Sequence, residues 1–190
     1  MDAPNFGARN ILILGVGLVI GVLLGAGVFL DPRWMWTQQA DYLISGGNSA
    51  LAVGKPAPDF ALESLSNGKL RLSDLRGHPI LINFWATWCG PCRQEMPLLQ
   101  KYYRKNQPDL VILAVNAGEE HGAVKAFADE FGLTFDMLLD PGMRVQDLYK
   151  IRGYPTTFFL DADGKIRAVL VGPLNESSLP GYLEKIGIGR

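Results

Sequence analysis

The sequence holds very little cysteine and almost no histidine. Its 190 residues include two cysteines and two histidines. The cysteines are Cys89 and Cys92, and their spacing is too short to close the long loop through which a structural disulfide stabilises a chain. Redox chemistry or metal binding must therefore explain the pair.

An excess of charge of either sign is also missing. Lys and Arg number 18 against 19 Asp and Glu, which gives a formal net charge of -1. The sequence therefore lacks the broad positive field that phosphate backbones attract, and we expect no nucleic acid partner. The length suits one compact domain with an attachment and is too short for two full-sized catalytic domains.

A long stretch without charged residues lies at residues 11–30. At about 1.5 Å per residue, a helix of that length spans roughly the 30 Å hydrocarbon core of a bilayer. We therefore expect a cytoplasmic N-terminus at 1–10, a transmembrane anchor at 11–30 and a linker at 31–53. Arg9 favours a cytoplasmic N-terminus, which places the rest of the chain outside the membrane. A cleaved signal peptide is the alternative, but its apolar region usually covers only about 7–15 residues.

The rest of the chain, residues 54–190, shows the alternating patterns of an α/β domain. Two short extended runs around Asn67-Gly68 predict an N-terminal hairpin. Residues 80–85 and 110–115 are nearly continuous apolar runs, typical of strands buried on both faces. Further patterns predict helices at 92–105, 124–131 and 179–186 and a terminal hairpin at 156–160 and 166–170. We expect a central mixed sheet, parallel in its centre and antiparallel at its end, with helices on both faces.

Cys89 follows a buried strand and precedes helix-forming sequence. Its sulfur should therefore lie among the free N–H groups at a helix N-terminus, where a thiolate is stabilised. The thiolate is the form that attacks a disulfide, so Cys89 is the predicted nucleophile. Cys92, one turn into the helix, is the predicted resolving thiol, which attacks the mixed disulfide and releases the reduced substrate. Gly90 and Pro91 between them can tune how readily the disulfide is reduced.

Metal binding is the alternative explanation of the two cysteines, because Cys-x-x-Cys is also a metal-ligand spacing. A copper chaperone would use the same two sulfurs as ligands without turnover. The sequence offers no second ligand pair: His78 lies in a Gly-His-Pro turn, His121 lies in a predicted loop, and neither has a second histidine at i+3 to i+5. We therefore assign no metal and no cofactor.

Two segments together resemble the thioredoxin superfamily, in particular its TlpA/ResA-like branch. They are Asn83–Cys92, which reads NFWATWCGPC, and Gly153–Phe158, which reads GYPTTF. The resemblance covers residues 54–186 and implies a thioredoxin-like fold. It also implies an anchored bacterial disulfide reductase that acts outside the cytoplasmic membrane in cytochrome c maturation. The implied substrate is the heme-binding Cys-x-x-Cys-His segment of apocytochrome c, and the implied electron donor is a membrane protein of the CcdA or DsbD type.

The resemblance further implies that a cis peptide bond precedes Pro155 and that this proline faces the cysteine pair. Proline has no N–H to compete for the sulfurs, and the backbone of Tyr154 can pair with an extended substrate segment. An ordinary loop proline is the alternative, since only about 5–6% of X–Pro bonds in folded proteins are cis. Trp88 is predicted to contact the substrate because it lies next to Cys89.

Asn83 is a departure from general thioredoxins, which have an acidic residue at this position. ResA-like members instead carry a glutamate three residues after the second cysteine, and Glu95 occupies that position. Helical spacing puts Glu95 on the same face as Cys92, without a basic neighbour with which to form a local ion pair. We predict that Glu95 transfers protons and tunes the thiols near neutral pH.

Other enzymatic functions use the same cysteines. A broader disulfide reductase or isomerase is one alternative. A thiol peroxidase is another, suggested by residues 57–60, an opening shared with peroxiredoxin relatives. Peroxiredoxins place a threonine three residues before their cysteine, whereas this sequence has Ala86 there. Peroxide activation needs that hydroxyl and a tuned thiolate, so the peroxidase is the weaker alternative.

Overall fold

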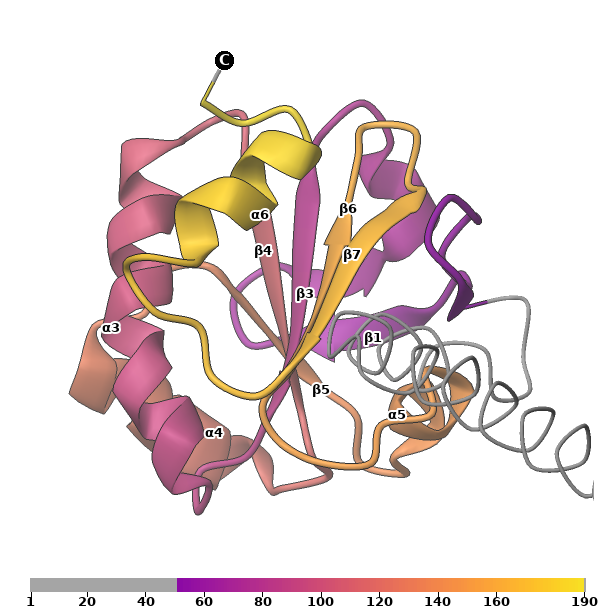
Figure 1. Cartoon of the computed structure of the whole chain (residues 1–190). Coiled ribbons are helices and arrows are strands. Elements are labelled where there is room, and N and C mark those ends of the chain that lie inside the picture. Colours follow the sequence, from indigo (N-terminus) through magenta and orange to yellow (C-terminus); the bar gives the residue numbers. More distant parts are fainter. Residues whose placement is uncertain (1–50, 190) are drawn as a thin grey trace, which may run out of the picture. The chain divides into compact units, whose positions relative to one another are not determined.

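Short apolar runs organise the chain around one seven-stranded sheet, in the order β2-β1-β5-β4-β3-β6-β7. The computed structural model describes residues 51–189 (Figure 1). The strands are β1 (Ala61–Ser64), β2 (Gly68–Arg71), β3 (Ile80–Trp85), β4 (Val111–Asn116), β5 (Asp136–Leu139), β6 (Thr156–Leu160) and β7 (Ile166–Val171). The helices are the 3-10 helix η2 (Leu72–Leu75) and the α-helices α3 (Gly90–Lys105), α4 (His121–Phe131), α5 (Arg144–Leu148) and α6 (Leu179–Lys185).

The centre of the sheet is parallel and both of its ends are antiparallel. β3 pairs with β4 and β4 with β5 in parallel, because a helix returns the chain between each pair. β6 and β7 follow antiparallel on one side, and β1 and β2 on the other. All six residues of β3 are buried, as expected for a strand covered on both faces. The predicted mixed thioredoxin-like sheet is confirmed.

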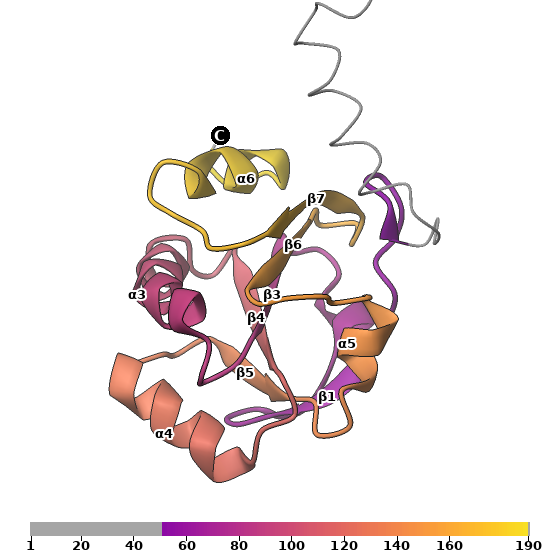
Figure 2. The same cartoon turned by 60° about the horizontal axis from the view of Figure 1, so that its bottom comes forward.

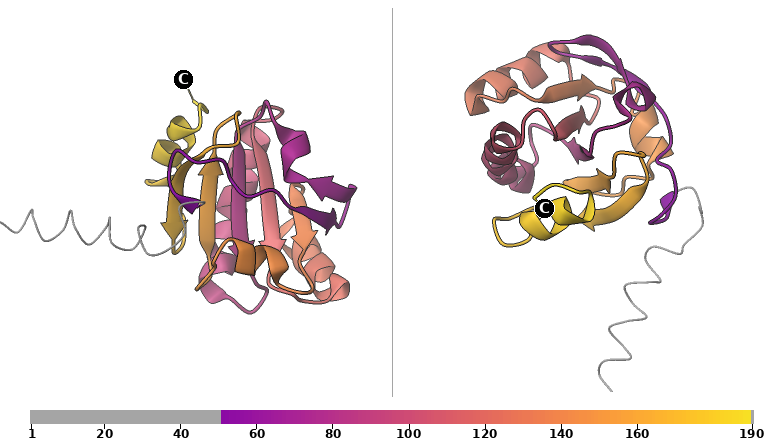
Figure 3. Two further views of the ribbon diagram at one scale, coloured as in Figure 1. Left: turned by 90° about the vertical axis from the view of Figure 1, so that its right-hand side faces the viewer. Right: turned by 90° about the horizontal axis from the view of Figure 1, so that it is seen from above.

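Helices cover both faces of this sheet (Figure 2). Met96 of α3, Phe127 of α4 and Leu183 of α6 belong to one apolar cluster, and Val145 of α5 and Leu72 of η2 belong to the other. The two views of Figure 3 show the helices on either side of the strands. Right-handed crossovers explain why α3 and α4 share a face, since each returns the chain to the next strand in the same direction.

Three elements of this sheet and its cover were not predicted, namely η2, β5 and α5. They contain only four or five residues each, too few for periodicity to distinguish a strand from a helix, and no hairpin turn marks β5 as Asn67-Gly68 marks the equally short β1 and β2. The predicted segments at 1–10 and 11–30, and the linker up to residue 50, lie outside the described residues. Within residues 51–189, no helix is both long enough and apolar enough to cross a membrane.

Candidate active site

Cys89 lies where the buried strand β3 gives way to helix α3, at the N-cap of that helix. Its Sγ accepts a hydrogen bond of 3.2 Å from the backbone N–H of Cys92. The first N–H groups of a helix have no partner within the helix, and they carry the positive end of its dipole. The sulfur of Cys89 therefore occupies the position that favours a thiolate, as the sequence predicts.

A disulfide joins Cys89 to Cys92, so the structure shows the oxidised form of the pair. Cys92 is fully buried, whereas Cys89 keeps 5% of its surface exposed. Gly90 and Pro91 are exposed in the first turn of α3. A Cβ added at Gly90 would meet no atom within 4 Å, so no neighbouring segment covers the motif on that side. An incoming thiol or disulfide can therefore approach Cys89 and not Cys92.

The peptide bond between Tyr154 and Pro155 is cis, as the resemblance implies. Pro155 is buried and directly precedes β6, whose first residue pairs with Phe84 of β3. The proline and the cysteine loop therefore lie at the same end of these two strands. The rings of Trp88 and Tyr154 meet edge to face, with centroids 5.8 Å apart, and Trp88 is 69% exposed. The two motifs that lie far apart in the sequence thus form one surface, although their roles in substrate binding stay predictions.

Glu95 lies one turn after Cys92 on α3 and is only 1% exposed. Its Oε1 accepts a hydrogen bond of 2.8 Å from Asn83 Nδ2, and its Oε2 accepts one of 2.7 Å from the backbone N–H of Leu174. Loss of solvent raises the pKa of Glu95 to about 7, and the two hydrogen bonds oppose this rise. The side chain is therefore an acid poised to gain or lose a proton near neutral pH.

The amide of Asn83 holds this acid in place. Nδ2 also donates a hydrogen bond of 3.0 Å to Thr157 Oγ1, whereas the buried Oδ1 has no partner. Asn83 thus supplies neutral donors where general thioredoxins have an acid. Sequence reasoning did not find Leu174, because a backbone N–H in a loop has no signature in the residue type.

Sequence reasoning also missed Glu119, which follows β4. The carboxylate of Glu119 accepts hydrogen bonds from the backbone N–H and the hydroxyl of Thr87, two residues before Cys89. The available signal was position: polar residues directly after adjacent parallel strands meet at one edge of the sheet, where α/β proteins place their sites.

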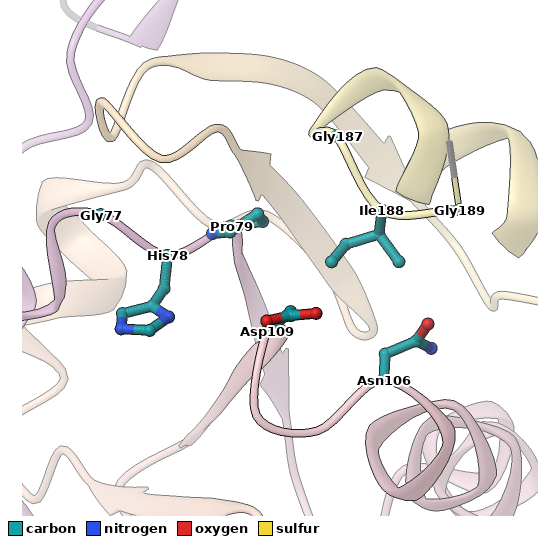
Figure 4. A pocket seen from close by; sticks show the side chains of 8 residues that line it. All are labelled: Gly77, His78, Pro79, Asn106, Asp109, Gly187, Ile188 and Gly189. Carbon is teal, nitrogen blue, oxygen red and sulfur yellow. The ribbon is translucent and has the colours of Figure 1, made fainter.

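The two histidines lie in different settings. His78 lines a pocket of about 400 Å³ together with Asp109, at the end of the sheet where β3 begins (Figure 4). That is the opposite end of β3 from Cys89. His121 is the first residue of α4, not a loop residue as predicted, because the helix already begins after the extended residue Glu120. Among the described residues, no three His, Cys, Asp or Glu side chains are grouped to hold a metal ion.

Comparison with protein families matches residues 53–169 to the AhpC/TSA family. Curated relatives include the thiol-disulfide oxidoreductase ResA of Geobacillus thermodenitrificans, which is 42% identical over 139 residues, or 73% of this chain and 80% of the relative. ResA of Bacillus thuringiensis is 34% identical over 179 residues, which cover 94% of each chain.

Solved structures show the same arrangement. A putative thiol:disulfide interchange protein DsbE from Chlorobium tepidum superposes with a TM-score of 0.63 at 33% identity, covering 71% of this chain and 98% of that one. A putative protein disulfide isomerase from Bacteroides thetaiotaomicron gives a TM-score of 0.63 at 30% identity, covering 70% of this chain and 87% of that one.

Proposed function

The chain belongs to the AhpC/TSA family of thioredoxin-like proteins, and from that premise we propose that it is a membrane-anchored reductase of extracytoplasmic protein disulfides. That it is a thiol-disulfide oxidoreductase of the ResA and DsbE type follows from its relatives. The proposed substrate is the heme-binding Cys-x-x-Cys-His segment of apocytochrome c, oxidised to a disulfide. The observation that carries the proposal is the Cys89–Cys92 disulfide at the N-terminus of α3.

The proposed reaction starts from the reduced pair. The Cys89 thiolate attacks one sulfur of the substrate disulfide, forms a mixed disulfide and expels the other substrate sulfur, which takes up a proton. The Cys92 thiol then loses its proton and attacks Cys89, which releases the second substrate sulfur. Two electrons have passed to the substrate, and the protein is left in the oxidised form that the structure shows.

Glu95 is the proposed proton acceptor for Cys92. The two residues are three positions apart on α3, so their side chains are neighbours on one face of the helix. With a pKa of about 7, Glu95 can accept the proton of the resolving thiol and return it at neutral pH. Glu95→Gln should slow turnover by about a hundredfold, within the usual range for loss of an acid-base group. An unchanged rate and an unchanged titration of the thiols would remove this role.

Tyr154 and Pro155 are the proposed wall against which the substrate lies. An extended segment can pair with the backbone of Tyr154, while Pro155 presents no N–H toward the sulfurs. Exposed Trp88 completes this surface beside Cys89.

A membrane anchor at residues 11–30 would keep the domain at the extracytoplasmic face of the membrane. The match to the Bacillus thuringiensis relative covers 94% of this chain, which leaves fewer residues unmatched than the apolar stretch contains. Part of that stretch therefore belongs to the length shared with ResA. A reductase in an oxidising compartment needs a supply of electrons, for which a membrane dithiol protein of the CcdA or DsbD type is the proposed source.

The test is to trap the natural substrate. Cys92→Ser in the full chain cannot resolve the mixed disulfide, so it should hold the substrate on Cys89, and mass spectrometry identifies the captured protein. Apocytochrome c joined through its Cys-x-x-Cys-His segment is the expected result, and Cys89→Ser with Cys92→Ser is the control that captures nothing. A broad set of unrelated proteins would indicate a general reductase instead. Buried Ala86 supplies no hydroxyl to peroxide, so wild-type protein should not turn over hydrogen peroxide.

A further inference from the structure

A chain of polar contacts joins the loop that carries Cys89 to the loop that carries Pro155. It begins at Glu119, whose Oε2 accepts a hydrogen bond of 2.7 Å from the backbone N–H of Thr87 and whose Oε1 accepts the Thr87 hydroxyl. A carboxylate that accepts both donors of one residue fixes the position of that residue more firmly than a single contact. The chain segment just before Cys89 is therefore held against the segment after β4.

The next link is Asn116, the last residue of β4. Its Nδ2 donates to Glu119 Oε2 at 2.7 Å, and its Oδ1 accepts the backbone N–H of Glu119 at 2.9 Å. The backbone carbonyl of Asn116 in turn accepts a hydrogen bond of 3.0 Å from Gln146 Nε2. Asn116 is fully buried and Gln146 is 2% exposed, so water does not compete for these contacts.

The last link is Tyr154, the residue before Pro155. Its hydroxyl donates to Gln146 Oε1. Burial, and then the negative charges of Asp140 and Glu119, raise the pKa of Tyr154, which keeps the hydroxyl protonated as a donor. The ring of Tyr154 also lies edge to face against Trp88, the residue after Thr87. The contacts thus run from Thr87 to Tyr154 and return through Trp88, so they join the loop before Cys89 to the loop before Pro155.

We infer that Glu119 and Gln146 are positioning residues of the oxidoreductase reaction. With Asn116 they form a polar bridge, defined here as Thr87, Glu119, Asn116, Gln146 and Tyr154, that fixes the spacing between the cysteine loop and the proline loop. This inference rests on the proposed binding of substrate at Tyr154 and Pro155.

The reason lies in the topology. β3 and β6 hold the two loops at their bases, but Trp88 and Tyr154 lie beyond the last paired residues of these strands. Strand pairing alone therefore does not fix the distance between the two loops. The polar bridge fixes it through α5, a helix of only five residues that contributes Gln146. A bridge of this kind should govern capture of a polypeptide that touches both loops, and it should matter little for a small disulfide that touches Cys89 alone.

The test compares two buried glutamines in the full chain. Gln146→Leu breaks the bridge between Asn116 and Tyr154. Gln100→Leu is the matched control: Gln100 is 5% exposed, donates to Thr134 Oγ1 at 2.8 Å, and lies about 12 Å along α3 from Cys92. Reduction of insulin disulfides, with dithiothreitol as donor, reports on a polypeptide substrate, and a small aromatic disulfide reports on the thiol chemistry. Urea unfolding of both variants checks that each is folded.

Gln146→Leu should raise KM for insulin about fivefold, the effect of losing one hydrogen bond. Its rate with the small disulfide should stay within about twofold of wild type, and Gln100→Leu should leave both values unchanged. Tyr154→Phe removes only the hydroxyl, so it should reproduce the rise in KM. The double variant with Gln146→Leu should be no worse than either single variant, because both break the same link.

An unchanged KM in Gln146→Leu, an equal rise in Gln100→Leu, or additive effects in the double variant would each overturn the inference. If insulin binds equally well to wild type and to a variant with Pro155→Ala, the proposed substrate wall itself is wrong. Because insulin is a general substrate, the outcome does not depend on whether apocytochrome c is the natural one.

Discussion

Asn83 Nδ2 donates a hydrogen bond of 2.8 Å to Glu95 Oε1 in a part of the core that solvent does not reach. The donor is neutral, so it fixes the carboxyl group without supplying the positive charge that would force it to ionise. Burial therefore dominates and raises the pKa of Glu95 to about 7 from its ordinary value of 4.5. An acid kept near neutrality in this way can serve both as proton donor and as proton acceptor.

The raised pKa of Glu95 predicts that the oxidised protein loses stability between pH 4.5 and about 7. Below this range both the folded and the unfolded states carry the proton. As the pH rises the unfolded chain releases its proton first, so the free energy of unfolding falls until Glu95 itself ionises. The total loss is roughly 3 kcal/mol. Glu95→Gln should remove it, which urea unfolding at several pH values measures.

Glu184→Gln is the control for this experiment, because Glu184 is an exposed glutamate on α6. Its stability should follow the wild-type curve at every pH. If Glu95→Gln and wild type keep a constant difference across the range, the carboxyl group of Glu95 does not titrate near neutrality in the folded protein.

Asn83→Asp should make the free energy of unfolding depend more steeply on pH. It places a second carboxyl group within hydrogen-bonding distance of Glu95, and two carboxylates so close cannot both ionise easily. The folded state then retains more protons than the unfolded chain over a wider range, so stability falls faster as the pH rises. Asn83→Ala is the matched control, since it removes the donor without adding a charge. Equal slopes for Asn83→Asp and Asn83→Ala would contradict the expectation.

The sequence predicts β3, β6 and the start of α3 well, because the signals for these elements are local. β3 is a nearly continuous apolar run, β6 precedes a clear turn signal, and both strands are buried along their whole length. The resemblance to ResA-like proteins points to Glu95, and helical spacing places it on the face of Cys92. A motif that follows a strand and opens a helix fixes the position of Cys89 in the same way. In each case the residues that set the position of the side chain lie within about one helical turn of it in the sequence.

The rest depends on partners that the sequence does not identify. Gln146 is an ordinary polar residue until α5 brings it between Asn116 and Tyr154, 30 and 8 residues away in the chain. The backbone N–H of Leu174 reaches Glu95 across 79 residues. Side-chain type gives no sign of such contacts, and β5 and α5 are too short to show a period.

Trp88→Ala should separate substrate binding from stability. The side chain is 69% exposed, so its loss should change the free energy of unfolding by less than about 0.5 kcal/mol. We expect KM for a polypeptide disulfide to rise, because an exposed aromatic ring beside the nucleophile is a contact surface. Val53→Ala is the matched control: Val53 is 52% exposed and precedes Gly54, whose N–H donates to Ile166 at the end of β7 away from Pro155. Equal KM values for the two variants would show that Trp88 does not contact the substrate.

Alkylation of the reduced protein should show that the two sulfurs differ. Cys89 caps α3 and keeps some exposure, whereas Cys92 has none. In Cys92→Ser, we expect the rate at which Cys89 reacts with iodoacetamide to rise with pH. The midpoint of this rise should lie below about pH 8.5, the value for a free thiol, because the helix N-terminus stabilises the thiolate. In Cys89→Ser, Cys92 should react more slowly by about tenfold or more, since it is buried. The assignment of nucleophile fails if Cys89 behaves as an ordinary exposed thiol and Cys89→Ser still reduces disulfides, because turnover would then have to begin at the sulfur that solvent and substrate do not reach.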